Sequence, residues 1–562
     1  MRKVFIASVG TLLVLFLATS GYPAQGTAAV QASGDITLHF GLQHEFDFEV
    51  RDNYDLDNGL TDGCTGSDCS GPTGEAVDGV FTNEMRLIIQ GSQGDIWKSR
   101  LTLESTEPPL EGRDENPRWA VERAWADIKI YDTPVHVKIG APLWDQLDPF
   151  RLVWSDDEPG IKVYATHGNI SWAFWWLKED DSNGIQVVAE NAGRDQDQDY
   201  YLARVDLDFG NFQISPFFGF VRNRTTTTDL RFARGVNGDF RRGVDPGTPS
   251  PGTAISADET LWYPGVIAKG TFGPVSFVGE FAAALGEIGD DSSVNTQREQ
   301  DVSAFMVAVD VGVKLGAWTP HAGIIWMSGD DNPLDDDAEA WAPIASDNEN
   351  LLGTNGILMD DANAALEVAD DALTADGVSP TARQFFTQPG MIAAFIGLKG
   401  RPTKKIKTDL NLIFFQWDSE KQFEYRDGIV TTVNCPTDPA TGGALLSTCP
   451  NTTFTNAIAH DPSDPTTTGL VTTIDDEVGW ELNGQVVYSY NKHVTLTIAA
   501  AVFFPGDGAE VLAQCANAIS TGSNGTGCDL GVDPVTGDAI IPSNERANDE
   551  AVKLAVELMV QF

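Results

Sequence analysis

The chain has 562 residues, with 36 Lys and Arg against 82 Asp and Glu, and a formal net charge of −46 at pH 7. This acidity excludes nucleic acid as a natural partner, because a phosphate backbone binds basic surfaces. After the first residues, no run approaches the ~20 consecutive apolar residues that a transmembrane helix needs.

The first residues predict an export signal. Met1, Arg2 and Lys3 form a short positive region, and the apolar run VFIASVGTLLVLFLA leads to small residues up to Ala28. This order is typical of a cleaved secretory signal peptide, and the apolar run is short for the alternative, a retained helical anchor. We expect residues 1–28 to be removed and residues 29–562 to form a single domain.

The rest of the chain alternates apolar and polar residues. In DITLHFGLQHEFDFEVR, for example, Phe46, Phe48 and Val50 fall on one face, and Glu45 and Asp47 fall on the other. A period of two predicts β-strands with one apolar and one polar face. The predicted strands cover 35–51, 80–92, 95–105, 119–131, 133–141, 160–167, 169–179, 199–209, 211–222, 259–270, 272–285, 301–315, 318–328, 390–400, 404–417, 476–490, 492–504 and 549–562.

The connections between these strands alternate in length. Tight turns are expected at Gly94-Asp95, Asp132-Thr133-Pro134, Gly168, Gly210-Asn211, Gly273-Pro274, Gly316, Arg401-Pro402 and Asn491-Lys492. The longest loops lie near 52–79, 223–258, 329–389, 418–475 and 505–548. Short turns at one end and long loops at the other are typical of bacterial outer-membrane proteins.

The sequence therefore predicts an all-β fold, a transmembrane antiparallel up-and-down β-barrel of about 18 strands in the bacterial outer membrane. Both termini fall on the periplasmic, short-turn side. A soluble β-helix or sandwich is the alternative, but such folds need turns of more uniform length.

The last strand, AVKLAVELMVQF, is apolar at every second residue up to Phe562. An unpaired strand of this kind would leave an open sheet edge, so we expect it to pair with the first strand and close the barrel, with Phe562 ending a lipid-facing row. The same strand is the expected contact with the barrel-assembly machinery. Aromatic clusters predict interfacial girdles; they comprise Trp172, Phe174, Trp176, Phe414, Phe415 and Trp417.

The polar parity of the strands carries interleaved acids and bases that we expect to line a water-filled lumen. Charges of both signs would set a transverse field across that water. The alternative is that they form ion pairs that only stiffen the wall. The candidate pore-lining residues are Glu84, Arg86, Lys98, Arg100, Glu104, Arg123, Asp127, Arg204, Asp206, Glu481, Asn483, Lys553 and Glu557.

Two further sets of residues lie in the predicted loops. One set offers hard oxygen ligands for calcium, although a hydrated acidic loop is the simpler interpretation; it comprises Asp330, Asp331, Asp335, Asp336 and Asp337. Six cysteines fall in three close pairs, Cys64 with Cys69, Cys435 with Cys449, and Cys515 with Cys528. In an exported protein such pairs predict disulfides that staple loops.

The sequence contains no motif for a catalytic centre or a bound cofactor other than calcium. It has neither a Gly-x-Ser-x-Gly nor a His-Glu-x-x-His motif, and no Cys-x-x-Cys-His for attached haem. We therefore expect a protein that is not an enzyme, with a hydrolase built from a Ser and a His that meet in space as the remaining alternative.

One segment near the carboxy terminus resembles a known family. The residues Gly479-Trp480-Glu481-Leu482-Asn483, the turn Asn491-Lys492 and the strand end Phe503-Phe504-Pro505-Gly506-Asp507 resemble the last part of alginate-export-type outer-membrane proteins. The resemblance covers about the last ninety residues and implies a single-chain barrel of the same strand number with a passive channel role.

These observations lead to one functional expectation, a porin-like or alginate-export-like channel for hydrophilic or ionic solutes. Its expected partners are outer-membrane lipid, small hydrophilic solutes or ions, and the assembly machinery. The alternatives are an occluded barrel that acts as a surface scaffold, adhesin or cation-binding protein, and a barrel sheath around an electron-transfer partner.

Overall fold

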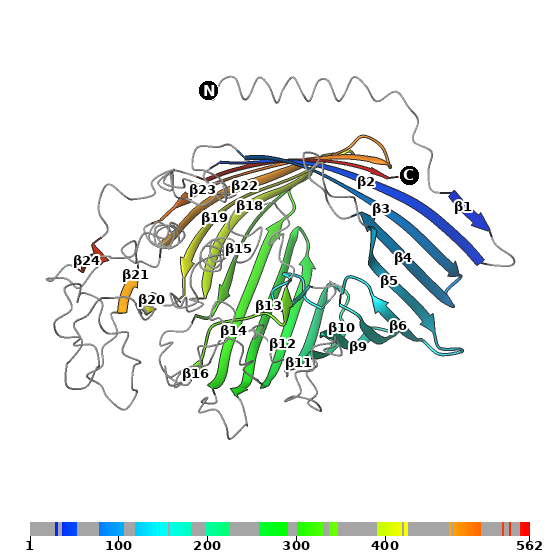
Figure 1. Cartoon of the computed structure of the whole chain (residues 1–562), viewed down its shortest axis with the longest axis horizontal. Coiled ribbons are helices and arrows are strands. Elements are labelled where there is room, and N and C mark those ends of the chain that lie inside the picture. Colours follow the sequence, from blue (N-terminus) through cyan, green and yellow to red (C-terminus); the bar gives the residue numbers. More distant parts are fainter. Residues whose placement is uncertain are drawn as a thin grey trace, which may run out of the picture.

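The computed structural model describes residues 28–31, 36–52, 78–105, 119–144, 147–155, 158–180, 198–223, 258–289, 300–329, 337–346, 390–418, 421–424, 471–474, 477–506, 531–532, 539–540 and 551–561. Its main feature is one large antiparallel sheet that curves round on itself (Figure 1). In the described part of the chain, 18 strands form a closed barrel, as the sequence predicts.

The barrel strands follow each other in chain order around the ring. They are β2 (Ile36–Asp52), β3 (Asp78–Gln93), β4 (Trp97–Ser105), β5 (Trp119–Lys129), β6 (Val135–Ala141), β8 (Gly160–His167), β9 (Ile170–Asp180), β10 (Gln198–Asp208), β11 (Phe212–Asn223), β12 (Asp258–Phe272), β13 (Val275–Gly289), β14 (Gln300–Val313), β15 (Trp318–Met327), β18 (Met391–Thr403), β19 (Ile406–Trp417), β22 (Glu477–Ser489), β23 (Val494–Pro505) and β26 (Ala551–Gln561).

Short strands lie outside the ring order. They are β1 (Ala28–Gln31), β7 (Trp154–Ser155), β16 (Asp337–Ala338), β17 (Ala345–Ser346), β20 (Lys421–Glu424), β21 (Val471–Ile474), β24 (Gly531–Val532) and β25 (Ala539–Ile540). The strands β1 and β16 extend the large sheet by pairing with β2 and β14, and the others form separate two-stranded pairs. The sequence did not predict these short strands.

The last barrel strand pairs with the first and closes the ring. The register runs from Gln43 opposite Gln561 to Asp52 opposite Val552, and β26 also pairs with β23. The edge that an open sheet would expose is thereby removed. The prediction for the closing strand is confirmed, while Phe562 itself lies outside the described residues.

The tight turns share one backbone feature. Glycines with φ between +54° and +86° occupy five of them, at Gly94, Gly168, Gly210, Gly273 and Gly316. This left-handed region is costly for residues with a Cβ, so the glycines that marked the turns in the sequence are those the turns require. One predicted turn was misplaced, because β18 continues through Arg401 and Pro402 to Thr403 and turns at Lys404 and Lys405.

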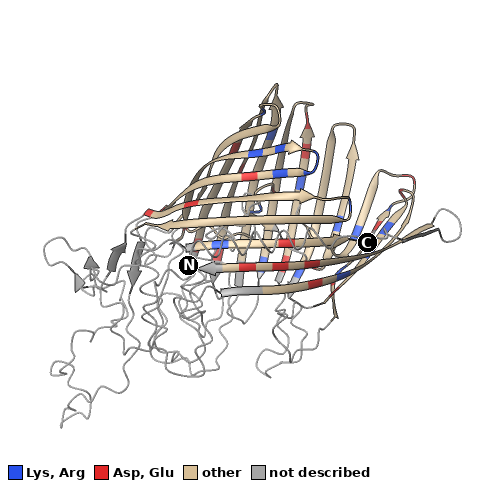
Figure 2. Ribbon diagram, turned by 90° about the horizontal axis from the view of Figure 1, so that it is seen from above, with Lys and Arg blue, Asp and Glu red and all other residues tan. Residues whose placement is uncertain are grey.

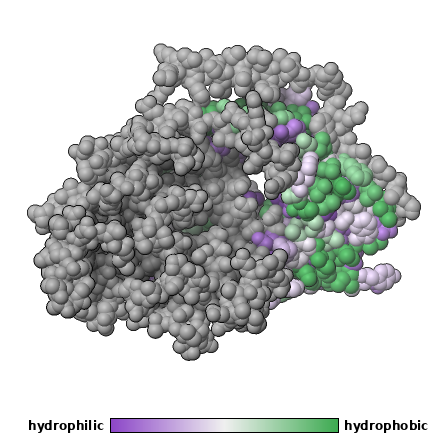
Figure 3. Space-filling view, viewed as in Figure 1, coloured by the Kyte–Doolittle hydropathy of each residue, from purple (hydrophilic) through white to green (hydrophobic). Residues whose placement is uncertain are grey.

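The outer face of the barrel exposes large apolar side chains, some of which Figure 3 shows over β4 to β6. Two aromatic rows flank them. Near the long-loop ends lie Trp119, Trp176, Trp262, Trp326, Trp480 and Phe504, and near the short turns lie Tyr131, Phe209, Phe272, Trp318 and Tyr490, all at least 38% exposed. An apolar band between two aromatic girdles fits a barrel that spans a bacterial outer membrane.

The predicted aromatic clusters divide between the two faces. Trp172, Phe174 and Trp176 are exposed on the outer face, as expected, but Phe415 and Trp417 are buried on the inner face. The prediction for these two residues was wrong because part of the inner face is apolar. No helix in the described residues is long and apolar enough to cross a membrane.

Candidate functional site

The inner face of the barrel carries both acidic and basic residues, and Figure 2 shows both signs of charge along the strands. All thirteen candidate residues from the sequence fall on the sheet face opposite the exposed apolar rows, as the registers of their strands require. These thirteen residues have different surroundings: some contact charged partners, and others are buried.

An acidic group surrounds Arg86 on β3. Its guanidinium lies 3.5 Å from Glu45, 3.1 Å from Glu104 and 3.3 Å from Glu122, and it also contacts Glu84 on its own strand. One positive and four negative charges give a formal sum of −3. The guanidinium is 24% exposed, so the group is neither sealed in the wall nor fully in water. We call these five residues the Arg86 cluster.

Two more arginines extend the Arg86 cluster along the inner face. Arg123 lies 3.2 Å from Glu122. On β4, the Nε of Arg100 donates to the hydroxyl of Thr102 at 3.0 Å. The sequence missed Glu122, because a bulge in the pairing of β4 with β5 adds this residue to the inner face.

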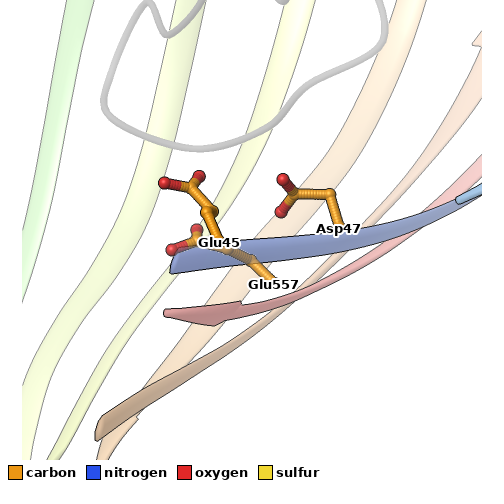
Figure 4. A group of neighbouring side chains, drawn as sticks. All are labelled: Glu45, Asp47 and Glu557. Atoms are coloured by element: carbon orange, nitrogen blue, oxygen red, sulfur yellow. The ribbon is translucent and has the colours of Figure 1, made fainter. Parts of the chain in front are cut away.

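A group of three carboxylates, which shares Glu45 with the Arg86 cluster, lies where β2 meets β26. Oxygens of Glu45, Asp47 and Glu557 lie within 4.8 Å of one another, and Figure 4 shows the three side chains on the same side of their strands. These are the oxygen ligands that calcium prefers. Because the three are only partly buried, water also reaches them, and they add to the negative charge of this part of the wall.

The wall from β5 to β10 has a different character, with cations set against aromatic rings. Lys138 lies 4.5 Å from the ring centre of Trp125, and Lys162 lies 4.6 Å from that of Trp175. A cation over an aromatic face is stabilised without losing its charge. These contacts keep the positive side chains of this sector in place along the inner face.

Hydrogen bonds order the carboxylates of this sector. Asp127 accepts a 2.6 Å hydrogen bond from the hydroxyl of Tyr164 and lies 3.2 Å from the Nδ1 of His136. Arg204 pairs with Asp206 at 2.7 Å. A cavity of ≈ 400 Å³ opens here, lined in part by Lys162, Arg204 and Asp206.

Two segments between barrel strands fold inward and meet each other. The strands β7 and β17 pair in parallel, and the backbone N–H of Ile344 donates to the carbonyl of Val153 at 2.9 Å. The indole of Trp341 donates to the carbonyl of Leu152 at 3.1 Å, and the hydroxyl of Tyr263 on β12 donates to the carbonyl of Ala342 at 3.2 Å. We call residues 147–155 and 338–346 the docked loops.

The docked loops pack on an apolar part of the inner face. Trp154 is fully buried, and its ring centre lies 5.1 Å from that of Tyr200 on β10 in an edge-on arrangement. Other buried side chains of this cluster are Leu147, Leu152, Leu177, Leu202, Leu261, Tyr263 and Ile344. The sequence analysis did not predict this apolar interior.

Asp148 holds the first docked loop in shape. Its carboxylate accepts backbone hydrogen bonds of 3.1, 3.0 and 2.9 Å from Leu152, Val153 and Trp154. Burial raises the pKa of Asp148 above its usual value, and these backbone hydrogen bonds oppose the rise. Glu280 on β13 is also buried, and neither of its oxygens has a hydrogen-bond partner in the described residues.

Three of the predicted residues on β22 and β26 are buried, whereas Glu557 is not. Glu481 and Asn483 are at most 2% exposed, and Asn483 donates to Glu481 at 2.6 Å and accepts from Asn411 at 3.3 Å. Lys553 is likewise buried, 3.7 Å from Glu49. These side chains belong to polar networks in the wall, and their role in lining the pore stays a prediction.

The backbone conformation explains why residue 479, which precedes this network, is a glycine. Gly479 has a φ of +136°, and a Cβ there would lie 2.2 Å from the carbonyl oxygen of Phe504. The strand pairing shifts its register beside this residue, so the glycine permits a bulge at the start of β22. The bulge precedes Glu481 and Asn483 on the inner face.

Several predicted sites lie outside the described residues or at their edge. The structure does not describe the six cysteines, the proposed signal peptide up to residue 27, or Asp330, Asp331, Asp335 and Asp336. Of the proposed calcium ligands, only the backbone of Asp337 is described, in β16. The disulfides and the calcium site therefore stay predictions.

No protein-family model and no curated protein matches the chain. Among solved structures it is similar to OccK2 (OpdF) of Pseudomonas aeruginosa, with 9% identity, a TM-score of 0.44, and coverage of 93% of this chain and 98% of that chain. For OpdK of the same organism with vanillate, the identity is 9%, the TM-score 0.43 and the coverages 93% and 99%.

A BenF-like porin from Pseudomonas fluorescens Pf-5 gives similar values, with 9% identity, a TM-score of 0.42 and coverages of 93% and 99%. At identities this low and TM-scores below 0.5, no residue role or substrate passes from these porins to this chain.

Proposed function

We propose that the protein is an outer-membrane channel through which small hydrophilic or ionic solutes diffuse, with no chemical step. The observation that supports this most directly is the uneven charge of the inner face. The acidic sector comprises the Arg86 cluster with Asp47 and Glu557, whereas the sector from β5 to β10 carries Lys138, Lys162 and Arg204 beside the carboxylates of Asp127 and Asp206. Charges of both signs on the wall of a wide barrel select solutes by charge and orientation.

The docked loops have a place in this proposal as the constriction. They lie against the inner face between β10 and β12, where Trp154 contacts Tyr200 and Ala342 contacts Tyr263. Segments that fold into the barrel reduce the cross-section open to solute, so pore width would be set here and charge selection by the remaining wall.

The resemblance to alginate-export-type proteins supports the channel class through the motif at the start of β22. The residues of this motif have local structural roles, because Gly479 permits the bulge and Glu481 and Asn483 form a buried network. Since neither Glu481 nor Asn483 is exposed to solute, the motif supports a barrel of this type and carries no argument for an alginate substrate.

Single-channel recording in a planar bilayer tests the proposal. We expect the refolded mature protein to give steady current steps under a salt gradient. Arg100→Glu should move the reversal potential towards cation selectivity, because it reverses a charge beside Glu122 and Arg123. The matched control, Leu101→Ser on the opposite face of β4, should leave the potential unchanged.

Two outcomes would contradict the proposal in different ways. Silence from protein that is shown to be folded and inserted would refute an open channel and favour the alternative of an occluded barrel, to which the docked loops would contribute. Equal reversal potentials for the wild type and the Arg100 variant would refute the role of this wall in selectivity while leaving conduction intact.

A further inference from the structure

The short-turn end of the barrel contains an inner pocket with an unusual charge. The pocket has a volume of ≈ 620 Å³ and lies between the ends of β14, β15, β18, β19 and β22. Its charged lining residues are Lys314, Lys399, Arg401 and Lys407, with Asp409 as the one carboxylate among them. Four cations thus converge on a space that is large enough for a small organic or inorganic ion.

Most of these cations have no carboxylate partner. Lys399 lies 3.3 Å from Asp310, so it is already paired. For Lys314, Arg401 and Lys407, no carboxylate lies within ion-pair distance in the described part of the chain. Elsewhere at the same end of the barrel, Lys129 is paired with Asp95.

The composition of the chain makes this lack of partners informative. With 82 acidic and 36 basic residues, a basic side chain has acids in excess to pair with. Three unpaired cations around one pocket repel each other, and an anion between them would remove that repulsion. The one carboxylate of the pocket is engaged, because Asp409 accepts a hydrogen bond from Asn411 at 3.2 Å.

The geometry points to a binding site for a multivalent oxyanion at the periplasmic mouth, held by Lys314, Arg401 and Lys407. Arginine offers a planar fork of N–H donors to paired oxygens, and the two lysines act as point charges around it. A chloride ion would meet only part of this charge, whereas a compact anion with several charged oxygens would meet all three side chains. Thr319 and Gln485 add polar side chains to the lining.

This inference deepens the proposed function by naming a class of solute, and it rests on that function only for transit through the barrel. Binding itself does not need conduction. Titration calorimetry of the full-length mature barrel in detergent micelles, with inorganic pyrophosphate as the probe, therefore tests the site without depending on current. Folding of each variant is checked first by β-sheet circular dichroism and by heat-modifiable migration.

We expect saturable binding of pyrophosphate to the wild type, and binding about tenfold weaker for Arg401→Gln or Lys407→Gln, as for the loss of one charged hydrogen-bond donor. Lys404→Gln is the matched control, since it removes the same charge from the same end of the barrel but Lys404 does not line the pocket. Its affinity should equal that of the wild type.

The possible results separate the two proposals. Folded wild type without saturable binding would overturn the site, and so would an equal loss in the Lys404 variant, because that would show attraction to the rim in general. Binding by a barrel that conducts no current would uphold the site and refute the channel. Current without binding would uphold the channel and refute the site.

Discussion

Removing the side chain of Trp154 should release the docked loops from the inner face of the barrel. Trp154→Ala removes a fully buried indole that packs edge-on against Tyr200, at the point where β7 pairs with β17. Truncating a buried Trp to Ala costs about 3–5 kcal/mol. If this free-energy loss falls on docking, it shifts the equilibrium between docked and released loops by a factor of roughly 10² to 4 × 10³.

Single-channel recording would detect this shift. We expect a larger mean conductance and more open-channel noise for Trp154→Ala than for the wild type, because the loops narrow the barrel only while they are docked. The control is Trp172→Ala on β9, which makes the same substitution on the outer face, where the side chain is 38% exposed. Unchanged conductance and noise in folded, inserted Trp154→Ala would refute the idea that these loops form the constriction.

Two further predictions concern Asp148 and Gly479. Burial raises the pKa of Asp148, so protonation favours docking: this stabilisation is fully present below its usual value of 3.8 and is lost as pH rises through the folded pKa. Open-channel noise should therefore increase with pH in the wild type, and Asp148→Asn should weaken that dependence. Gly479→Ala should destabilise the barrel by about 1–3 kcal/mol, given its φ of +136°. Denaturant midpoints in micelles would show this, with Gly279→Ala on β13, where a Cβ has room, as the control.

The barrel itself was predictable from the sequence because two independent signals agree. Each long strand must present an apolar row to lipid, so one parity is apolar over its whole length, as in β26. Each tight turn needs a residue that accepts a left-handed backbone, and Gly94, Gly168 and Gly210 meet that need. Strand period and turn residues together fixed the number and order of the barrel strands.

The apolar interior was not predictable in this way. In β10, QDYYLARVDLD, the inward Tyr200 and Leu202 alternate with the outward Tyr201 and Ala203, so both parities begin apolar. The sequence shows that both faces of β10 are apolar at its start, but it does not show which residues cover the inner face. The cover comes from residues 147–155 and 338–346, which are distant in the chain and pair through only two short strands.

The charged pocket at the short-turn end was hidden for a different reason. Each of its three cations, Lys314, Arg401 and Lys407, lies close to a tight turn. Charged residues near turns normally face water, so their presence in the sequence does not indicate a binding site. Their convergence depends on the pairing of β18 with β15 and β19, which sequence periodicity does not reveal. The misplaced turn at Arg401-Pro402 added to this, because it assigned Arg401 to the connection and not to the inner face of β18.

The net charge of −46 does not contradict an anion site at the periplasmic mouth. β18 has 13 residues, which at ~3.3 Å per residue and a tilt of roughly 40° separate its two ends by about 33 Å along the barrel axis. The Debye length at physiological ionic strength is about 8 Å, so charge at the long-loop end is screened over roughly four such lengths. The local balance at the pocket, four cations against Asp409 and the nearby Asp310, therefore decides which ions bind there. Charge at the long-loop end sets the electrostatic field only for solutes that enter the barrel from outside the cell. A channel of this kind would discourage external anions at its entrance and still hold an anion at its periplasmic mouth.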